Sequence, residues 1–416
     1  MPYPETISAD RDIAGLRWLS IIGIGEDGLD GLSPQARRLV SEAELVVGGS
    51  RHLAMAAILI RGETLVWPSP IDTAFPAILA RRGKPVAVLA SGDPFNYGIG
   101  KQLAAIVVVD EMISLPQPSA FSLAASRLGW ALQDVAAVTL HGRPLENLIR
   151  VLHPGRRILA LSWDGTTPGK VKELLVSRGL GRSRATVLER MGGPAERQRS
   201  GTAETLDTAD VDPLNVIAIE VAGDARSLII PRAFGLDDAL FETDGQLTKR
   251  EIRAIVLSSL APRYGERLWD IGLGSGSIAI EWLLADPSLS AIGIEERPDR
   301  AARAKRNALA LGAPALQVIE GRAPAALAGL PQPDAVFVGG GITNDGVFEA
   351  AWDALKPGGR FVANAVTLEA EARLAALNAA HGGDLIRFAI SRAEPLGGMT
   401  GWRPALPITH WRAVKP

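Results

Sequence analysis

The chain has 416 residues, of which 47% are hydrophobic and 22% charged, which is the balance of a globular protein. Because domains are commonly about 100 to 200 residues long, this length predicts two domains or slightly more. The formal net charge of -2, from 44 Lys and Arg against 46 Asp and Glu, gives no overall positive field to hold a nucleic-acid backbone. With 0 cysteines, disulfides, thiolate metal sites and cysteine nucleophiles are excluded.

We expect a cytoplasmic protein without a membrane, nucleic-acid or metal partner. Residues 1–12 are polar and acidic and lack the apolar core of a secretory signal. Apolar stretches such as Leu53–Ile60 and Leu103–Val109 are far shorter than the roughly 18 to 20 residues that span a bilayer. The 5 histidines are scattered, with no pair at the spacing of helical metal ligands.

Apolar runs of strand length alternate with amphipathic segments along the first half of the chain. Buried strands are predicted at Trp18–Gly23, Pro85–Ala90, Arg157–Trp163 and Asn215–Val221. A helix is predicted after Ser33-Pro34, because serine can cap a helix and proline suits its first turn. This alternation predicts an α/β fold with mostly parallel sheets.

Two glycine loops follow the first two of these strands. The first reads GIGEDG at 23–28, and the second reads SGDPFNYG at 91–98. Pro94 and the flanking glycines predict a tight turn at the strand end rather than a helix start. Together the two loops resemble the tetrapyrrole (class III) methylase family, in which two α/β subdomains hold a folded S-adenosylmethionine between them.

This resemblance covers essentially 16–221 and includes PQPSAFSLAASRLGW at 116–130. It implies cofactor contacts at Gly23, Gly25, Asp93, Phe95, Ser119 and Ala120. The alternative for Asp93 is that it caps its own turn.

His141-Gly-Arg143 resembles the branch of that family that methylates carbon 5 of the cobalamin precursor. The resemblance implies that Arg143 contacts a polycarboxylate substrate, which a guanidinium can bind in a bidentate fork. Arg143 could instead pair with a surface carboxylate, and His141 could be a structural histidine. Arg197 and Arg199 could bind the substrate too, or simply alternate outward on a strand.

The alternation of strands and helices breaks between Val221 and Thr248, where loop chemistry surrounds one short apolar stretch. We therefore predict a first domain at 1–223, a linker at 224–240 and a second domain at 241–416. The glycine motifs of the two halves differ in spacing, which argues against a duplication.

The second half opens with a predicted strand at Arg267–Ile271, a turn through three glycines and a helix from about Ser277. Glycines allow positive φ and let a backbone approach a ligand closely. Further strands are predicted at Ala291–Ile294, Ala335–Val338 and Arg360–Val366. In open α/β sheets, ligands bind where a strand end faces a helix N-terminus.

Two cofactor classes compete for this glycine turn. A dinucleotide loop reads G-x-G-x-x-G, whereas Ser277 stands at the sixth position here. Asp270 precedes Gly272 by two residues, and Glu295 ends the next strand, where a carboxylate can accept both ribose hydroxyls. This acid-x-G-x-G-x-G pattern resembles the first motif of the Rossmann-like methyltransferases, in which the acid orients the amino-acid end of S-adenosylmethionine. Nicotinamide binding is the alternative.

The segments LTKREIRA, GSGSIAIEW, EGRAP and PDAVFVGGG, within 247–341, together resemble the decarboxylating half of the precorrin-6Y methyltransferase family of cobalamin biosynthesis. This resemblance runs from about Phe234 to the C-terminus and implies a seven-stranded Rossmann-like fold. Its cofactor contacts carry over to Thr248, Gly272, Leu273, Gly274, Ser275, Gly276, Glu295 and Ala323. Glu296 and Arg322 are the neighbouring alternatives to the last two.

The turn after the fourth strand of this half is Gly339-Gly340-Gly341. Amino-directed methylases place an Asn/Asp-Pro-Pro-aromatic tetrapeptide there to accept hydrogen bonds from the target amine. Three glycines offer room and N–H groups but no such acceptor, which favours a broad, flat substrate that is already nucleophilic. The alternative is a glycine turn without substrate contact.

Taken together, the two resemblances imply a bifunctional enzyme that methylates carbons 5 and 15 of a precorrin and decarboxylates its ring-C acetate. They imply one S-adenosylmethionine site per domain, a small-molecule tetrapyrrole substrate and a homo-oligomer, either dimer or tetramer. No pattern singles out a catalytic residue, although Lys249, Arg250, Arg392 and Arg403 are candidates for holding the acetate. The rivals are methylation of RNA or protein, and a first domain that only binds.

Overall fold

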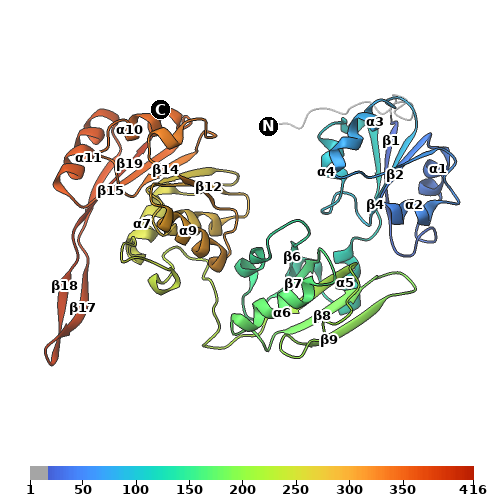
Figure 1. The fold of residues 1–416 in the computed structure, drawn as a ribbon, viewed down its shortest axis with the longest axis horizontal. Helices are drawn as coiled ribbons and strands as arrows, with labels where there is room; N and C mark the ends of the chain where they lie inside the picture. The colour runs from blue at the N-terminus through green and yellow to red at the C-terminus, as the bar shows by residue number, and fades with distance from the viewer. Residues whose placement is uncertain (1–16) are drawn as a thin grey trace, which may run out of the picture. The chain divides into compact units, whose positions relative to one another are not determined.

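The computed structural model describes residues 17–416, which form two compact units (Figure 1). The first unit contains the described residues up to Arg143 together with His153–Leu228, and the second contains Pro144–Leu152 and Ile229–Pro416. Residues 1–12, on which the expected localisation partly rests, lie outside the described range. Within that range, no helix is long and apolar enough to cross a membrane.

The first sheet of the first unit has five parallel strands in the order β3-β2-β4-β1-β5. Its strands are β1 (Leu19–Ile24), β2 (Leu45–Gly48), β3 (Glu63–Val66), β4 (Val86–Ser91) and β5 (Met112–Leu115). The helices between them are α1 (Pro34–Glu42), α2 (Ser50–Ala56), η2 (Ile71–Ala74), α3 (Phe75–Leu79), α4 (Gly100–Ala104) and η3 (Val109–Glu111). Helix α1 begins as predicted, because the Ser33 side chain accepts a hydrogen bond from Ala36 N.

The second sheet of this unit has the order β6-β7-β10-β8-β9. Its strands are β6 (Val135–Thr139), β7 (Arg157–Leu161), β8 (Arg184–Glu189), β9 (Arg197–Thr202) and β10 (Asn215–Glu220), with helices α5 (Ala120–Leu128), η4 (Leu132–Asp134) and α6 (Thr167–Ser177). Only β6 and β7 pair in parallel, so the prediction of mostly parallel sheets is wrong here. The turn at 190–196 is too short for the crossover that a parallel pair requires, so β8 and β9 run antiparallel.

The second unit contains a seven-stranded sheet in the order β13-β12-β11-β14-β15-β19-β16. Its strands are β11 (Arg267–Ile271), β12 (Ser290–Glu295), β13 (Gln317–Glu320), β14 (Ala335–Val338), β15 (Arg360–Ala365), β16 (Asp384–Phe388) and β19 (Ile408–Val414). The first five are parallel, and β19 is antiparallel to both of its neighbours. This order confirms the predicted seven-stranded Rossmann-like fold.

The helices of this unit are α7 (Arg250–Leu260), α8 (Ser277–Ala285), α9 (Pro298–Leu311), α10 (Val347–Ala354), α11 (Leu368–His381), and the short η5 (Leu145–Val151), η6 (Asp238–Leu240) and η7 (Ala325–Leu327). Although η5 belongs to the first half of the sequence, Ile149 packs beside Gly312 at the end of α9. Its neighbour Arg150 donates a hydrogen bond to Leu283 O at 3.2 Å.

A two-stranded hairpin, β17 (Ser391–Leu396) and β18 (Met399–Pro404), extends away from the rest of the second unit (Figure 1). Its large apolar side chains are strongly exposed: Leu396 by 71%, Met399 by 80% and Trp402 by 77%. A two-stranded hairpin has little stability of its own in water.

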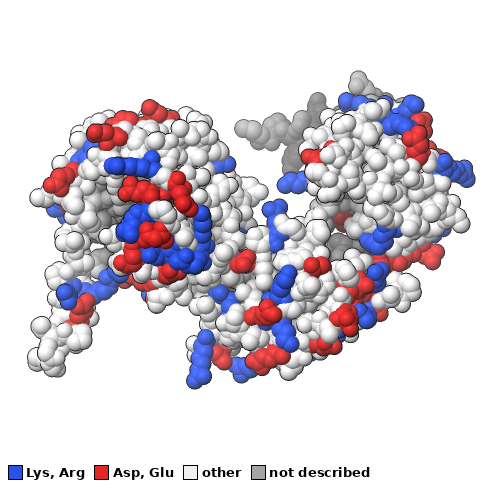
Figure 2. Space-filling model, viewed as in Figure 1, with Lys and Arg blue, Asp and Glu red and all other residues white. Residues whose placement is uncertain are grey.

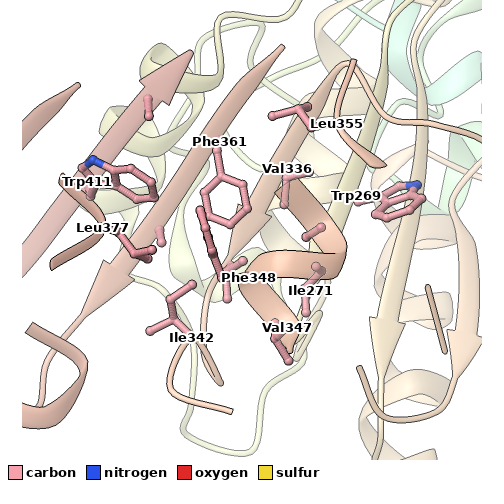
Figure 3. Packing of buried hydrophobic residues seen from close by; sticks show 14 of the residues in the cluster. Trp269, Ile271, Val336, Ile342, Val347, Phe348, Leu355, Phe361, Leu377 and Trp411 are labelled. Carbon is pink, nitrogen blue, oxygen red and sulfur yellow. The ribbon is translucent and has the colours of Figure 1, made fainter. Parts of the chain in front are cut away.

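Aromatic packing holds β15 and β19 against α10 (Figure 3). Phe361 is fully buried, and its ring lies 5.2 Å from Phe348, 6.0 Å from Trp352 and 5.6 Å from Trp411, centroid to centroid. Rings at such distances and tilts gain energy beyond the area that they bury. This cluster therefore sets the position of β15.

We expect Phe361→Ala to lower the free energy of unfolding of the second unit by about 3 to 5 kcal/mol, because it leaves a cavity among rings that cannot collapse into it. The matched control is Leu368→Ala, since Leu368 is 79% exposed on α11. Urea titration followed by tryptophan fluorescence measures both variants. Equal losses in the two would contradict the packing described above.

Candidate functional site

A cavity of about 570 Å³ lies at the carboxyl ends of the parallel strands of the second unit. Nearly all residues of this unit that are predicted to contact the cofactor or the substrate line the cavity: Thr248, Asp270, Gly272, Leu273, Gly274, Ser275, Glu295, Ala323, Gly339, Gly340 and Gly341. Gly276 is the exception: it does not line the cavity but caps α8 and packs against Ala304 on α9.

The turn from β11 to α8 is built from left-handed glycines. Gly272, Gly274 and Gly276 have φ angles of 78°, 57° and 80°, which side chains disfavour. The N–H groups of Gly272 and Leu273 both donate to Ile294 O at 3.0 Å, which attaches the turn to the end of β12. On its other side, a Cβ on Gly272 would lie only 3.4 Å from Gly340 O, so the two glycine turns face each other.

Asp270 is buried at the start of this turn, where one carboxylate oxygen accepts a hydrogen bond from Ala279 N at 3.1 Å. Burial removes water from the carboxylate and raises its pKa, the hydrogen bond from Ala279 N opposes this, and the charge of Glu295 adds to it; the net result is a pKa of about 7. Near neutral pH this carboxyl is therefore partly protonated.

Glu295 is held by backbone N–H groups on both oxygens. It accepts hydrogen bonds from Gly274 N at 2.8 Å and from Arg297 N at 3.0 Å. Its lone pairs toward the cavity remain available for further donors. The adjacent Glu296 has a 61% exposed side chain and lies 3.8 Å from Arg322. Nearby, Ser275 Oγ is buried and has no hydrogen-bond partner among the described residues.

The segment before α7 forms one wall of the cavity through residues 246–249. It is anchored by Arg253, which is fully buried and donates to Glu281 at 2.8 Å and to Leu236 O. Glu281 in turn accepts from Gly235 N and Leu236 N. Asn307 donates to Ser275 O at 2.9 Å and accepts from Glu242 N, so a second anchor joins the segment before α7 to the glycine turn.

Every cation that lines the cavity has a carboxylate beside it. Lys249 lies 3.6 Å from Asp238, Arg300 lies 2.8 Å from Asp244, and Arg322 pairs with Glu296 as above. The other candidates for an acetate contact, Arg250, Arg392 and Arg403, do not line the cavity. The latter two lie on the hairpin and pair with Glu251 and Glu394.

Asn364 and His410 are the residues that sequence reasoning missed. Asn364 lines the cavity at the end of β15, and His410 is its cross-strand neighbour on β19. Neither belongs to a glycine motif, and a lone asparagine at a strand end carries no signal of its own.

Three predicted segments meet in the first unit. A side chain on Gly23 would overlap the carbonyl oxygen of Gly92 and come within 2.6 Å of Gln117 N. Gly92 has a φ of 54°, and its Cβ would lie 2.8 Å from Pro118 O. Backbones therefore touch where loops 23–28 and 91–98 meet the start of α5.

Asp93 caps its own turn, since it accepts a hydrogen bond from Phe95 N at 2.9 Å, and Phe95 is half exposed. Ser119 caps α5 by accepting from Ser122 N at 3.1 Å, and Ala120 is the first residue of that helix. Gly25 follows β1 directly. Asp93 therefore has the turn-capping role that was the alternative to a cofactor contact. The remaining lone pairs of its carboxylate can still accept hydrogen bonds.

An ion-pair network ties the loop at 23–28 to the second sheet of this unit. Glu26 pairs with Arg51 and lies 3.2 Å from Arg190, which pairs with Asp212 at 2.6 Å. Tyr97 of the other loop packs edge-on against Phe121 of α5, with ring centroids 5.8 Å apart.

His141 and Arg143 lie exposed in the turn after β6. Arg197 and Arg199 both donate to the buried Glu189, at 2.6 Å and 2.9 Å, so they neutralise a carboxylate of their own sheet. Within residues 17–416, no cluster of three or more His, Asp or Glu side chains could hold a metal ion.

Comparison with known proteins first defines the class. Residues 19–207 match the family described as "Tetrapyrrole (Corrin/Porphyrin) Methylases", and residues 239–415 match the "Precorrin methyltransferase domain". The chain thus joins two kinds of methyltransferase domain in one polypeptide.

The whole chain is 59% identical over 398 residues to a precorrin-6Y C(5,15)-methyltransferase (decarboxylating) from Sinorhizobium sp., covering 96% of each. The chain belongs to this family. It is also 30% identical, over 43% of its length and 88% of the relative, to a cobalt-precorrin-7 C(5)-methyltransferase of Salmonella typhimurium. A probable cobalt-precorrin-6B C(15)-methyltransferase (decarboxylating) of Saccharolobus solfataricus is 38% identical over 32% of the chain and 71% of that relative.

The raised pKa of Asp270 predicts a pH dependence of stability. Between its ordinary pKa of 3.8 and its folded pKa of about 7, the unfolded chain has lost this proton and the folded chain retains it. The free energy of unfolding therefore falls as pH rises, by about 1.4 kcal/mol per pH unit from this group.

Asp270→Asn has no proton to lose at this position. Urea unfolding of both chains at about pH 5, 6 and 7 should show the wild type losing stability relative to the variant. A difference that stays constant with pH would contradict the raised pKa.

Proposed function

We propose that this chain transfers two methyl groups from S-adenosylmethionine to carbons 5 and 15 of a precorrin and removes carbon dioxide from the ring-C acetate, within cobalamin biosynthesis. The single observation that carries the proposal is the similarity to the Sinorhizobium enzyme over 96% of the chain, which spans both units. The loops at 23–28 and 91–98 supply a candidate methyl-donor site in the first unit, and the glycine turn at 272–276 supplies one in the second.

We propose that the first domain, 1–223, methylates carbon 5 and that the second, 241–416, methylates carbon 15 and decarboxylates, with 224–240 as the linker. Relatives named for one activity each support this division. The C(5) relative matches 43% of the chain and the C(15) relative 32%, so neither match is longer than one of the proposed domains.

The residues of the second unit fit S-adenosylmethionine. Among residues 17–416, the buried Ser275 Oγ has no hydrogen-bond partner and Asp270 accepts from one backbone N–H, so both have capacity for a polar ligand. We propose that the glycine turn and Asp270 hold the amino-acid end of the cofactor, Glu295 accepts the ribose hydroxyls, and Ala323 lies beside the adenine.

The cofactor supplies a methyl group on a sulfonium, which is already an activated electrophile. The chain's own residues then have to align the acceptor carbon, exclude water and tolerate a flat substrate. Alignment alone can contribute roughly 7 to 11 kcal/mol to a barrier. Gly339, Gly340 and Gly341 leave room for the tetrapyrrole beside the glycine turn, and Arg143 is the proposed contact for its carboxylates in the first unit.

Methylation of RNA is disfavoured by the surface charge. Figure 2 shows positive and negative side chains side by side over the visible face of each unit, rather than a basic stripe. Around α9, for example, Arg300, Arg303 and Arg306 pair with Glu242 and Asp244. A nucleic-acid backbone needs unpaired cations in a row.

The test is the mass of the product formed by the full chain with a precorrin substrate and labelled S-adenosylmethionine. The wild type should add two methyl groups and release one carbon dioxide. Glu295→Ala removes the ribose acceptor and should weaken cofactor binding in the second unit about 10- to 100-fold, so the product loses the carbon-15 methyl and keeps its acetate. The exposed Glu296→Ala is the matched control.

The complementary variant is Gly92→Val in the first unit. Its side chain would meet Pro118 O and force a φ that valine avoids, so the product should lose the carbon-5 methyl. If both variants lose the same methyl group, or calorimetry counts one cofactor site per wild-type chain, the division of labour fails and the first unit is a binding module.

We also propose that the protein acts in the cytoplasm as a homo-oligomer, a dimer or tetramer. The exposed apolar side chains of the β17–β18 hairpin support self-association, because exposed apolar patches of this kind mark contact surfaces.

The double variant Leu396→Ser and Trp402→Ser should therefore lower the mass measured by light scattering to that of a monomer. Tyr264→Ser is the control, since Tyr264 is 87% exposed and does not belong to the hairpin. An unchanged mass for the double variant would show that the hairpin does not mediate assembly.

A further inference from the structure

Three side chains joined by hydrogen bonds lead to the cavity of the second unit. His410 is 1% exposed, and its Nδ1 lies 2.8 Å from Asn364 Oδ1, while its Nε2 lies 2.9 Å from Ser259 Oγ on α7. Asn364 and His410 are direct cross-strand partners in the register of β15 and β19. This series of hydrogen bonds therefore runs from α7 across the interior strands β19 and β15 to the cavity wall.

The direction of these hydrogen bonds follows from chemistry. A carbonyl oxygen only accepts, so Nδ1 of His410 carries the proton and donates it to Asn364 Oδ1. Burial and the charge of Arg412 lower the pKa of His410 to about 4, so the ring is neutral and its Nε2 accepts from the Ser259 hydroxyl. With its oxygen engaged, Asn364 presents its NH₂ group.

The NH₂ group of Asn364 has no partner among the described residues, and Asn364 lines the cavity. The register pairs Val338 with Ala363, which puts Asn364 level with Gly339, the first glycine of the proposed substrate turn. The cavity's cations are already paired with carboxylates. An oriented neutral donor therefore stands where the substrate is proposed to lie.

We infer that Asn364 binds the acetate carboxylate that leaves as carbon dioxide, and that His410 and Ser259 are positioning residues that aim its NH₂ group. This inference rests on the proposed function of the second unit. In the step itself, the bond between the methylene carbon and the carboxylate carbon breaks, and its electron pair passes into the conjugated macrocycle. A proton from water then occupies the freed position on the methylene carbon, so the acetate becomes a methyl group.

A neutral donor suits this step better than a guanidinium does. The negative charge leaves the carboxylate as the bond breaks, so a full positive charge on the carboxylate would stabilise the ground state more than the transition state. An amide N–H orients the carboxylate with less ground-state stabilisation, because its hydrogen bond is not assisted by a second charge.

Asn364→Asp tests the contact. The aspartate keeps an oxygen for His410 but replaces the NH₂ donor with a carboxylate that repels the acetate. In the full chain with a precorrin substrate, we expect the rate of carbon dioxide release to fall about 10- to 100-fold. The thermal midpoint and the S-adenosylmethionine binding isotherm should stay close to those of the wild type.

Asn344→Asp places the same charge on an exposed residue that also lines this cavity. No described side chain orients the amide of Asn344 by a hydrogen bond, so this variant should lower the rate of carbon dioxide release much less. If the wild type releases no carbon dioxide, the proposed function fails. If the wild type releases carbon dioxide and Asn364→Asp releases it equally fast, only the inference about Asn364 is overturned. The same holds if Asn364→Asp and Asn344→Asp lower the rate of release equally.

The positioning role has its own readout. Ser259→Ala should lower kcat for carbon dioxide release with little change in cofactor binding, and Ser259→Thr, which keeps the hydroxyl, should restore it. In an Asn364→Ala background, Ser259→Ala should have no further effect, because it acts through Asn364. If the two substitutions lower kcat additively in the double variant, Ser259 does not act through Asn364 and is a structural residue only.

Discussion

The turn between β11 and α8 is the constraint on which the rest of the second unit depends. Its three left-handed glycines let the chain leave a buried strand and start a helix without a side chain in the way. Because Gly272 and Leu273 both donate to Ile294 O, the turn is attached to β12, and Glu295 is brought under Gly274 N. Much of the wall beside the proposed cofactor site is therefore backbone, which leaves the side chains free for orientation and charge.

The two units use glycine for the same reason in different arrangements. In the first unit, separate loops approach so closely that a Cβ on Gly23 or Gly92 would strike a neighbouring backbone. In the second unit, one turn suffices, and buried anchors such as Arg253 with Glu281 hold the adjoining wall. Each cation that lines the second cavity is paired with a carboxylate, so none of them offers a free positive charge to a substrate carboxylate that loses its charge.

The sequence predicted the eight strongly apolar strands to within a residue or two, because a fully buried strand is a continuous apolar run bounded by turn residues. Strands β2 and β3 were missed, although β14, which also has four residues, was predicted; β3 is mostly exposed and therefore forms no buried apolar run. The antiparallel pairing of β8 and β9 was also missed, because pairing direction depends on how a turn closes. The predicted cofactor residues of the second unit gather around one cavity, Gly276 excepted, because strand, turn and helix are adjacent in the chain.

By itself, the sequence determined the α/β class, the strand-turn-helix motifs and the acids that flank the second glycine turn, because these features are local. Only the tertiary structure decided the pKa of Asp270, since burial depends on everything packed around it. Likewise, only the fold could pair the cations of the cavity with carboxylates and bring His410 onto Asn364, 46 residues away. Cross-strand register places residues far apart in the chain side by side, and no local pattern records that register.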